Sequence, residues 1–194
     1  MVGLPAAVSR PSLPPLPARV PSRVGASCAH GPRFVFVLAL LLATAVACRS
    51  AVSLANGQSS STALAAAVLA ALERRDEPAL RALAIDEGEF GSRVWPELPA
   101  SRPERNLPFS YVWGDLRQKS EVGLARTLAS YGGQRRTLVE VTFTGGVTQY
   151  PTFLVHRDAV LTVADSSGVR SELRAFGSVI EQDGLFKAFS YVVD

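Results

Sequence analysis

The spacing of hydrophobic residues changes once along the chain, near residue 136. Before that point the spacing follows the helical period. Leu64, Val68 and Leu72 recur every four residues, in a segment that Ser61 or Thr62 can cap. This pattern predicts an amphipathic helix that buries one face.

More helices follow in the same half of the chain. A short helix is predicted over 76–83, and Asp86 with Glu89 has the spacing of a capping box that opens one or two further turns. After a proline-rich loop at 96–108 comes the strongest helical pattern, which ends where Gly132 provides a stop signal. Its apolar residues share one face: Phe109, Trp113, Leu116, Leu124, Leu128 and Tyr131.

Beyond residue 136 the period is two, which is typical of half-buried strands. Asp165 to Gly168 and the pair Asp183-Gly184 have the composition of tight turns, so neighbouring strands should be antiparallel. Strands are predicted over 136–144, 148–156, 159–164, 169–181 and 185–193. Helices followed by such strands predict an α+β fold, with the N-terminal helices packed on one face of a curved antiparallel sheet of four to five strands.

The first 47 residues differ from the rest in charge. They hold four arginines and no acidic residue, so the formal charge of +3 belongs to this segment and not to the folded part. Nucleic-acid binding by the domain therefore has little support. Residues 1–33 are proline-rich and predicted to be disordered. Residues 34–47 form an apolar run that is too short to cross a hydrocarbon core of about 30 Å, and they match the apolar region of a secretory signal.

Ala47 and Cys48 close this apolar run. Ala45-Val46-Ala47 has the small-x-small pattern that an export peptidase reads, and Cys48 after it resembles a bacterial lipobox, although most lipoboxes carry leucine at the position of Ala45. We predict cleavage after Ala47 and lipidation of Cys48. Plain secretion, an uncleaved anchor and a core cysteine are the alternatives. Cys28 leaves with the leader, so the mature chain has no internal disulfide.

The lipobox resemblance implies attachment to the extracytoplasmic side of a bacterial membrane through a lipid anchor. Arg49 follows the cysteine in place of the aspartate associated with retention in the inner membrane, which favours the outer membrane in a cell that has one. Residues 48–61 then form a polar tether, and 62–194 form a single α+β domain. A soluble secreted or periplasmic protein is the alternative.

The order of elements and the C-terminal sequence EQDGLFKAFSYVVD resemble the nuclear-transport-factor-2-like superfamily of cone-shaped α+β folds. Its members often end in a D-G-x-aromatic-K strand, which here is Asp183, Gly184, Phe186 and Lys187. The superfamily usually has a strand between its early helices, and 84–108 shows no clear one, so the cystatin-like folds remain open. The resemblance implies a ligand pocket at the mouth of the cone and a sheet that often pairs into a homodimer.

A few members of that superfamily are isomerases, dehydratases or cyclases. Such enzymes need a carboxylate or histidine base and a donor, often tyrosine, in an apolar pocket. Asp115 and Tyr111, four residues apart on the long helix, are the catalytic candidates together with His156. Further candidates on the strands are Glu140, Tyr150 and Tyr191.

Aromatic residues beside the proline-rich loop are the ligand-binding candidates: Trp95, Tyr111 and Trp113. The mature chain keeps one histidine and one cysteine, so we predict no metal site, and we predict no cofactor. The sequence therefore predicts a non-catalytic binding or assembly domain tethered to a membrane. Its partner is predicted to be a small apolar ligand, a peptide or an envelope protein. A small pocket enzyme is the alternative.

Overall fold

The computed structural model describes residues 53–192. The predicted leader, the cleavage site at Ala47 and the lipidation site at Cys48 lie outside the described residues. Within 53–192, no helix has both the length and the apolar character required to cross a bilayer.

The N-terminal half is helical, as predicted. Its elements are α2 (Ser61–Arg74), α3 (Glu77–Ala82), α4 (Glu87–Glu89), the π-helical turn η1 (Phe90–Val94), three 3-10 turns η2 (Trp95–Glu97), η3 (Pro99–Ser101) and η4 (Pro103–Arg105), and α5 (Phe109–Tyr131). The predicted bounds of α5 and its end before Gly132 are confirmed. The segment 96–108, expected to be an irregular loop, contains the three short 3-10 turns.

Side chains cap these helices where the sequence indicates polar caps. The predicted cap of α2 is wrong by one position: Ser60, in an extended conformation, accepts a hydrogen bond from the Ala63 backbone N–H at 3.0 Å. Asp76 caps α3, and both bonds of the Asp86–Glu89 capping box are present. The caps therefore determine where each short helix begins.

Seven strands follow: β1 (Thr137–Phe143), β2 (Val147–Gln149), β3 (Leu154–His156), β4 (Ala159–Ala164), β5 (Arg170–Leu173), β6 (Val179–Gln182) and β7 (Leu185–Ala188). They form two antiparallel sheets, in the orders β1-β4-β5 and β2-β3-β6-β7. The α+β class is confirmed. The single sheet of four to five strands is wrong, because the chain passes from one sheet to the other after β1, after β3 and after β5.

Two predicted strands are each interrupted. The predicted strand 148–156 folds into a hairpin, because the Tyr150 N–H bonds the Phe153 carbonyl at 2.9 Å around Pro151. The predicted strand 169–181 breaks after Leu173, and the chain then changes sheets. The last strand ends at Ala188, earlier than the predicted 193. The Asp183-Gly184 turn is confirmed, with positive φ at both residues.

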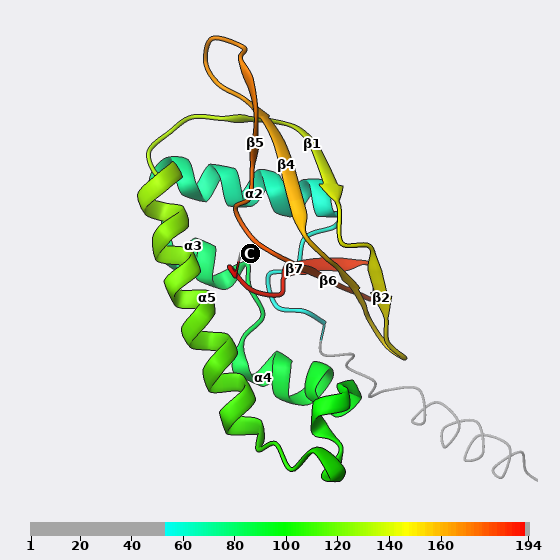
Figure 1. Cartoon of the computed structure of the whole chain (residues 1–194). Coiled ribbons are helices and arrows are strands. Elements are labelled where there is room, and N and C mark those ends of the chain that lie inside the picture. The colour runs from blue at the N-terminus through cyan, green and yellow to red at the C-terminus, as the bar shows by residue number, and fades with distance from the viewer. Residues whose placement is uncertain (1–52, 193–194) are drawn as a thin grey trace, which may run out of the picture. The chain divides into compact units, whose positions relative to one another are not determined.

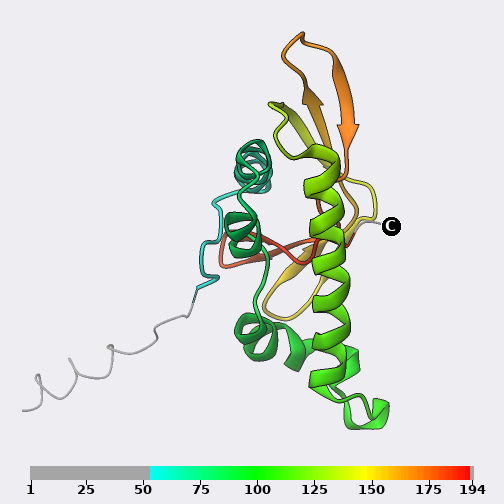
Figure 2. The same ribbon diagram turned by 90° about the vertical axis from the view of Figure 1, so that its left-hand side faces the viewer.

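Two hydrophobic clusters form the core. The first lies between α2 and the three-stranded sheet and includes the predicted buried face Leu64, Val68 and Leu72. The second gathers around Phe90 and Ile180, beside the four-stranded sheet. Helix α5 runs past both clusters, and in Figure 1 it extends from the end that carries α2 to the end that carries α4. Figure 2 shows α2 and α3 on one side of β7 and α5 on the other.

The chain joins the domain before α2. Leu54 is buried, and Gln58 exchanges two backbone hydrogen bonds with Phe186 at 2.8 and 2.9 Å. The Ala55 N–H also donates to the Glu89 carboxylate at 2.7 Å. Residues 54–58 are thus packed on the domain, and a polar tether that ends at residue 61 would be shorter by this segment.

Candidate functional site

Three hollows lie along α5. The largest, about 670 Å³, lies between α5 and residues 174 and 191–192, and we call it the basic hollow because Lys119, Arg126 and Arg174 line it. The second, about 390 Å³, is the apolar hollow, which Phe90, Leu98, Val112, Leu116, Phe176 and Phe189 line. The third, about 250 Å³, is the rim pocket between α5 and residues 81–87. All three are open to solvent.

The basic hollow carries more positive than negative charge. Its charged lining residues are Lys119, Arg126, Arg174 and Asp115. Lys119 donates to Asp115 at 2.8 Å, one turn away on the same helix. Both side chains of this pair are more than half exposed, so its contribution to stability is below about 1 kcal/mol.

A close contact between backbones forms the floor of the basic hollow. A Cβ at Gly123 would overlap the carbonyl oxygen of Tyr191, so α5 approaches the C-terminal segment more closely than any other residue type permits. A Cβ at Gly177 would likewise overlap the carbonyl oxygen of Val192. The two glycines let residues 190–192 run between α5 and the chain that follows β5.

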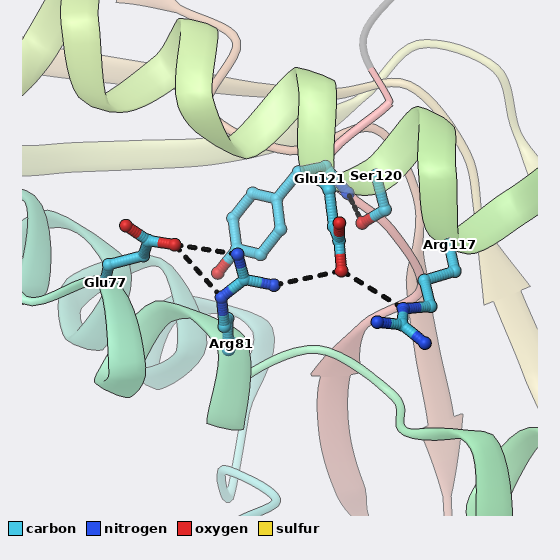
Figure 3. A network of polar contacts seen from close by, with 6 residues as sticks. Glu77, Arg81, Arg117, Ser120 and Glu121 are labelled. Carbon is cyan, nitrogen blue, oxygen red and sulfur yellow. Dashed lines mark hydrogen bonds and ion pairs between the residues drawn. The ribbon is translucent and has the colours of Figure 1, made fainter.

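The rim pocket has an apolar floor and a charged rim. Its floor includes Ile85, Trp113, Leu116, Leu124 and Phe189. On the rim, Arg81 donates to Glu77 at 2.7 Å and to Glu121 at 3.3 Å, and Arg117 donates to Glu121 at 3.1 Å (Figure 3).

This rim network changes the pKa values of two of its members. The hydrogen bond from Arg117, followed by that from Arg81, holds the pKa of Glu121 below its ordinary value. The hydrogen bond to Glu77 raises the pKa of Arg81. The rim charges thus neutralise one another across α3 and α5.

The Trp113 indole Nε1, by contrast, is buried and has no hydrogen-bond partner among the described residues.

A buried ion pair lies in the interior. The Lys187 ammonium donates to the Glu89 carboxylate at 2.7 Å, and only 2% and 7% of the two side chains are exposed. The same carboxylate accepts from the backbone N–H groups of Ala55 and Asp86 at 2.7 and 3.0 Å. Glu89 therefore joins the N-terminal segment, α4 and β7 through hydrogen bonds to three groups.

Within the described residues 53–192, Tyr191 is the other buried ionisable side chain. Its hydroxyl donates to the Leu80 carbonyl at 2.6 Å, and burial raises the pKa of the phenol. Its backbone N–H donates to the Ser120 hydroxyl at 3.0 Å. Because the hydroxyl is already bonded to the backbone of α3, Tyr191 serves to pack the C-terminal segment between α3 and α5.

The structure does not bring the predicted catalytic pair into one apolar pocket. Tyr111 and Asp115 lie on α5, but Tyr111 is 67% exposed, and Asp115 is paired with Lys119 at the mouth of the basic and apolar hollows. Glu140 is exposed on β1, and Tyr150 stacks on Phe153 with ring centroids 4.5 Å apart.

His156 has a partner that sequence spacing does not reveal. Its Nε2 lies 2.7 Å from the Glu181 carboxylate across the β3–β6 pairing. Its ring packs near Phe143, at 5.0 Å between centroids. Residues 157–158 then turn the chain from β3 into β4, with Asp158 at positive φ. His156 thus lies in a half-buried pair that links two strands.

The predicted binding aromatics divide between core and surface. Trp95 and Trp113 are half-buried and pack against Phe90, with centroids 6.4 and 5.2 Å from its ring. Trp113 also lines the rim pocket. Tyr111, in contrast, is mostly exposed, so the three rings do not form one groove.

Sequence reasoning missed the residues that give the hollows their character. Arg126 and Arg174 lie 48 positions apart, on α5 and after β5. No local pattern joins two arginines at that separation. Glu89 and Lys187 each occur in a recognised local motif, a capping box and a D-G-x-aromatic-K strand. The sequence contains one signal for their pairing: each is a charged residue at a position that faces the core, and buried charges of opposite sign usually pair.

Among residues 53–192, no group of three or more His, Cys, Asp or Glu side chains is arranged to hold a metal ion. Asp115 belongs to an ion pair, and His156 contacts one carboxylate. Comparisons of the chain with protein-family models, with curated proteins and with solved structures return no significant match.

Proposed function

We propose that the chain is a bacterial extracytoplasmic lipoprotein whose folded part is a non-catalytic binding domain, held at a membrane through Cys48. The anchor part rests on the sequence of 34–48: an apolar run, a small-x-small site and a cysteine directly after it. The binding part rests on the described domain.

One contrast carries the binding part: the buried ionisable side chains are already hydrogen-bonded within the domain, whereas the hollows along α5 are open to solvent. The buried ionisable side chains Glu89, Lys187 and Tyr191 are bonded to one another or to the backbone. Acid–base catalysis needs a base that can reach a substrate proton. Hollows of about 390 and 670 Å³ are open beside the same helix, and hollows of this size are typical of ligand sites.

We also propose that the fold is of the nuclear-transport-factor-2-like kind, with the cystatin-like folds as the alternative. Ala84 forms a parallel bridge with Ala188, which gives a minimal strand between α3 and α4. This bridge lies where the superfamily usually has its early strand. The helices before the sheets and the Asp183-Gly184 hairpin before β7 also support the proposal.

Mass spectrometry of the mature protein tests the anchor. We expect an N-terminal peptide that begins at Cys48 and carries acyl chains, and we expect the protein in the membrane fraction. Cys48→Ser should abolish both, whereas Cys28→Ser should change neither. A soluble protein with a free, unacylated Cys48 would support plain secretion and contradict the lipid anchor. An intact N-terminus upstream of residue 34 would refute cleavage after Ala47 and lipidation of Cys48.

A further inference from the structure

Among residues 53–192, two arginines of the basic hollow have no hydrogen-bond or ion-pair partner. Neither Arg126 nor Arg174 makes a hydrogen bond or an ion pair within residues 53–192, although Lys119 beside them is paired with Asp115. A guanidinium group binds a carboxylate or phosphate through two parallel hydrogen bonds. The hollow thus presents two such groups to an anion.

The apolar hollow lies directly beside the basic one. The two share Asp115, Lys119, Arg174 and Val192 as lining residues. Among the described residues, Asp158 is the one further charged residue that lines the apolar hollow, and most of its other unshared lining residues are aromatic or aliphatic: Phe90, Leu98, Val112, Leu116, Ala159, Phe176 and Phe189. Its volume of about 390 Å³ is more than twice the roughly 150 Å³ of an apolar cavity that binds benzene. Arg174 therefore lies where the cationic hollow meets the apolar one.

We propose that the two hollows form one site for an anionic amphiphile. Its carboxylate or phosphate binds Arg126 and Arg174, and its hydrocarbon chain enters the apolar hollow. The ligand class follows from the pairing of cationic and apolar linings at a shared border. This inference deepens the proposed function, since it names the ligand of the binding domain.

Calorimetric titration of the full chain carrying Cys48→Ser tests the site, with decanoate and decyl phosphate as probes. Both should bind at least tenfold more tightly than decanol or decyltrimethylammonium. From octanoate to decanoate, affinity should rise about fourfold per added methylene, the fold-change that corresponds to about 0.8 kcal/mol. Equal binding of decanol, or inorganic phosphate that binds as tightly as decyl phosphate, would refute an amphiphile site.

Variants in the same background locate the site. Arg126→Gln with Arg174→Gln should lower decanoate affinity at least tenfold and bring it to that of decanol. Arg102→Gln with Arg105→Gln, which removes the same charge from two exposed arginines elsewhere, should leave affinity within twofold. The leader is the same in all variants, so any amphiphile that it binds cancels in the comparison. Equal losses in both pairs would refute the site.

The apolar hollow has its own variants. Val112→Phe on α5 should fill part of the hollow and flatten the dependence on chain length, and Ser178→Leu, just before β6, should do the same. Circular dichroism and thermal unfolding identify a variant that fails to fold. The chain-length dependence of affinity is then measured on the other variant. Unchanged chain-length dependence in a folded variant would exclude the hollow as the chain site.

Phosphatidylglycerol vesicles distinguish the sources of the anion. Binding of decanoate without vesicle binding indicates a free amphiphile, and binding of both indicates a lipid taken from a bilayer. Arginine-dependent binding to vesicles without binding of decanoate would overturn the proposal, because the arginines would then bind the anionic surface of a membrane and not a single amphiphile. None of these results depends on acylation of Cys48, so the anchor and the site can fail separately.

Discussion

Lys187→Met removes the charge of a buried ammonium while keeping most of the length and apolar stem of the side chain. In the native domain that ammonium lies 2.7 Å from the Glu89 carboxylate, and 2% of the lysine side chain is exposed. The variant leaves a buried carboxylate that still accepts from the backbone N–H groups of Ala55 and Asp86. It therefore isolates the contribution of one charge.

The expected loss of stability is about 3–5 kcal/mol, the cost of leaving one member of a buried ion pair without its partner. The two remaining backbone donors place the loss near the lower end of that range, because they solvate part of the carboxylate. A loss of this size is a large fraction of the 5–15 kcal/mol that holds a typical domain together. Lys187→Met should hence unfold at a clearly lower urea concentration than the wild type.

Urea unfolding followed by circular dichroism measures the loss, and two controls give it meaning. Glu77→Gln breaks an ion pair with the same 2.7 Å separation, but Glu77 is half exposed, so the loss should stay below about 1 kcal/mol. The double variant Glu89→Gln with Lys187→Met removes both charges, and it should be more stable than Lys187→Met alone. Together with the single variant Glu89→Gln, these measurements complete a double-mutant cycle. The loss of stability in the double variant minus the sum of the two single losses gives the coupling energy of the pair.

Two results would refute this reasoning. A loss below about 1 kcal/mol for Lys187→Met would mean that water or a neighbouring group compensates the carboxylate, contrary to its burial. A double variant less stable than the single would mean that Glu89 acts mainly by accepting from Ala55 and Asp86, with the charge of Lys187 secondary.

Three further predictions concern the segment 190–192 and α5. Gly123→Ala should destabilise the domain by about 1–3 kcal/mol, because the added Cβ overlaps the Tyr191 carbonyl oxygen. Gly114→Ala, on the same helix, is the control: its Cβ meets nothing within 4 Å, so it should stabilise the domain by about 0.5–1 kcal/mol. Thermal unfolding of the two variants compares their stabilities. Tyr191→Phe should cost about 0.5–1.5 kcal/mol in urea unfolding, since it removes one hydrogen bond to the Leu80 carbonyl, which keeps the Leu83 N–H as a donor. Burial raises the pKa of Tyr191 above its ordinary value of 10.0, so its contribution is present below that pH and is lost as pH rises further. The wild type should then lose more stability than Tyr191→Phe between about pH 9 and about pH 11.

Local patterns predicted the helices and turns of this domain closely. The bounds of α5, the capping box at Asp86 and the hairpin at Asp183-Gly184 depend on residues within a few positions of one another. The cap of α2 was displaced by one residue only, to Ser60. Such features follow from backbone geometry and neighbouring side chains, which the sequence carries directly.

The division into two sheets could not be read from the period of two. At 150–153 and 174–178, where the chain turns or changes sheets, apolar and polar residues are mixed without regular alternation, and neither segment contains a strong two-residue turn signal. A pattern of alternation specifies which face a residue occupies, and it does not specify the partner strand. Pro151 gave a local warning, because proline within a sheet is confined to an edge strand or a bulge. Gly177 gave the second, and it reflects a contact with Val192 that only the fold creates.

The buried ion pair and the apolar hollow belong to one arrangement. Phe90 follows Glu89 directly, Phe189 lies two positions after Lys187, and both rings line the apolar hollow. The two rings contact each other edge to face, with centroids 6.3 Å apart. The ion pair thus holds in place the two chain segments that supply this aromatic wall. A buried charge pair is a poor source of stability compared with apolar packing, but it restricts the partners that each segment can accept. In this domain, that restriction gives the hollow beside Arg174 a defined shape.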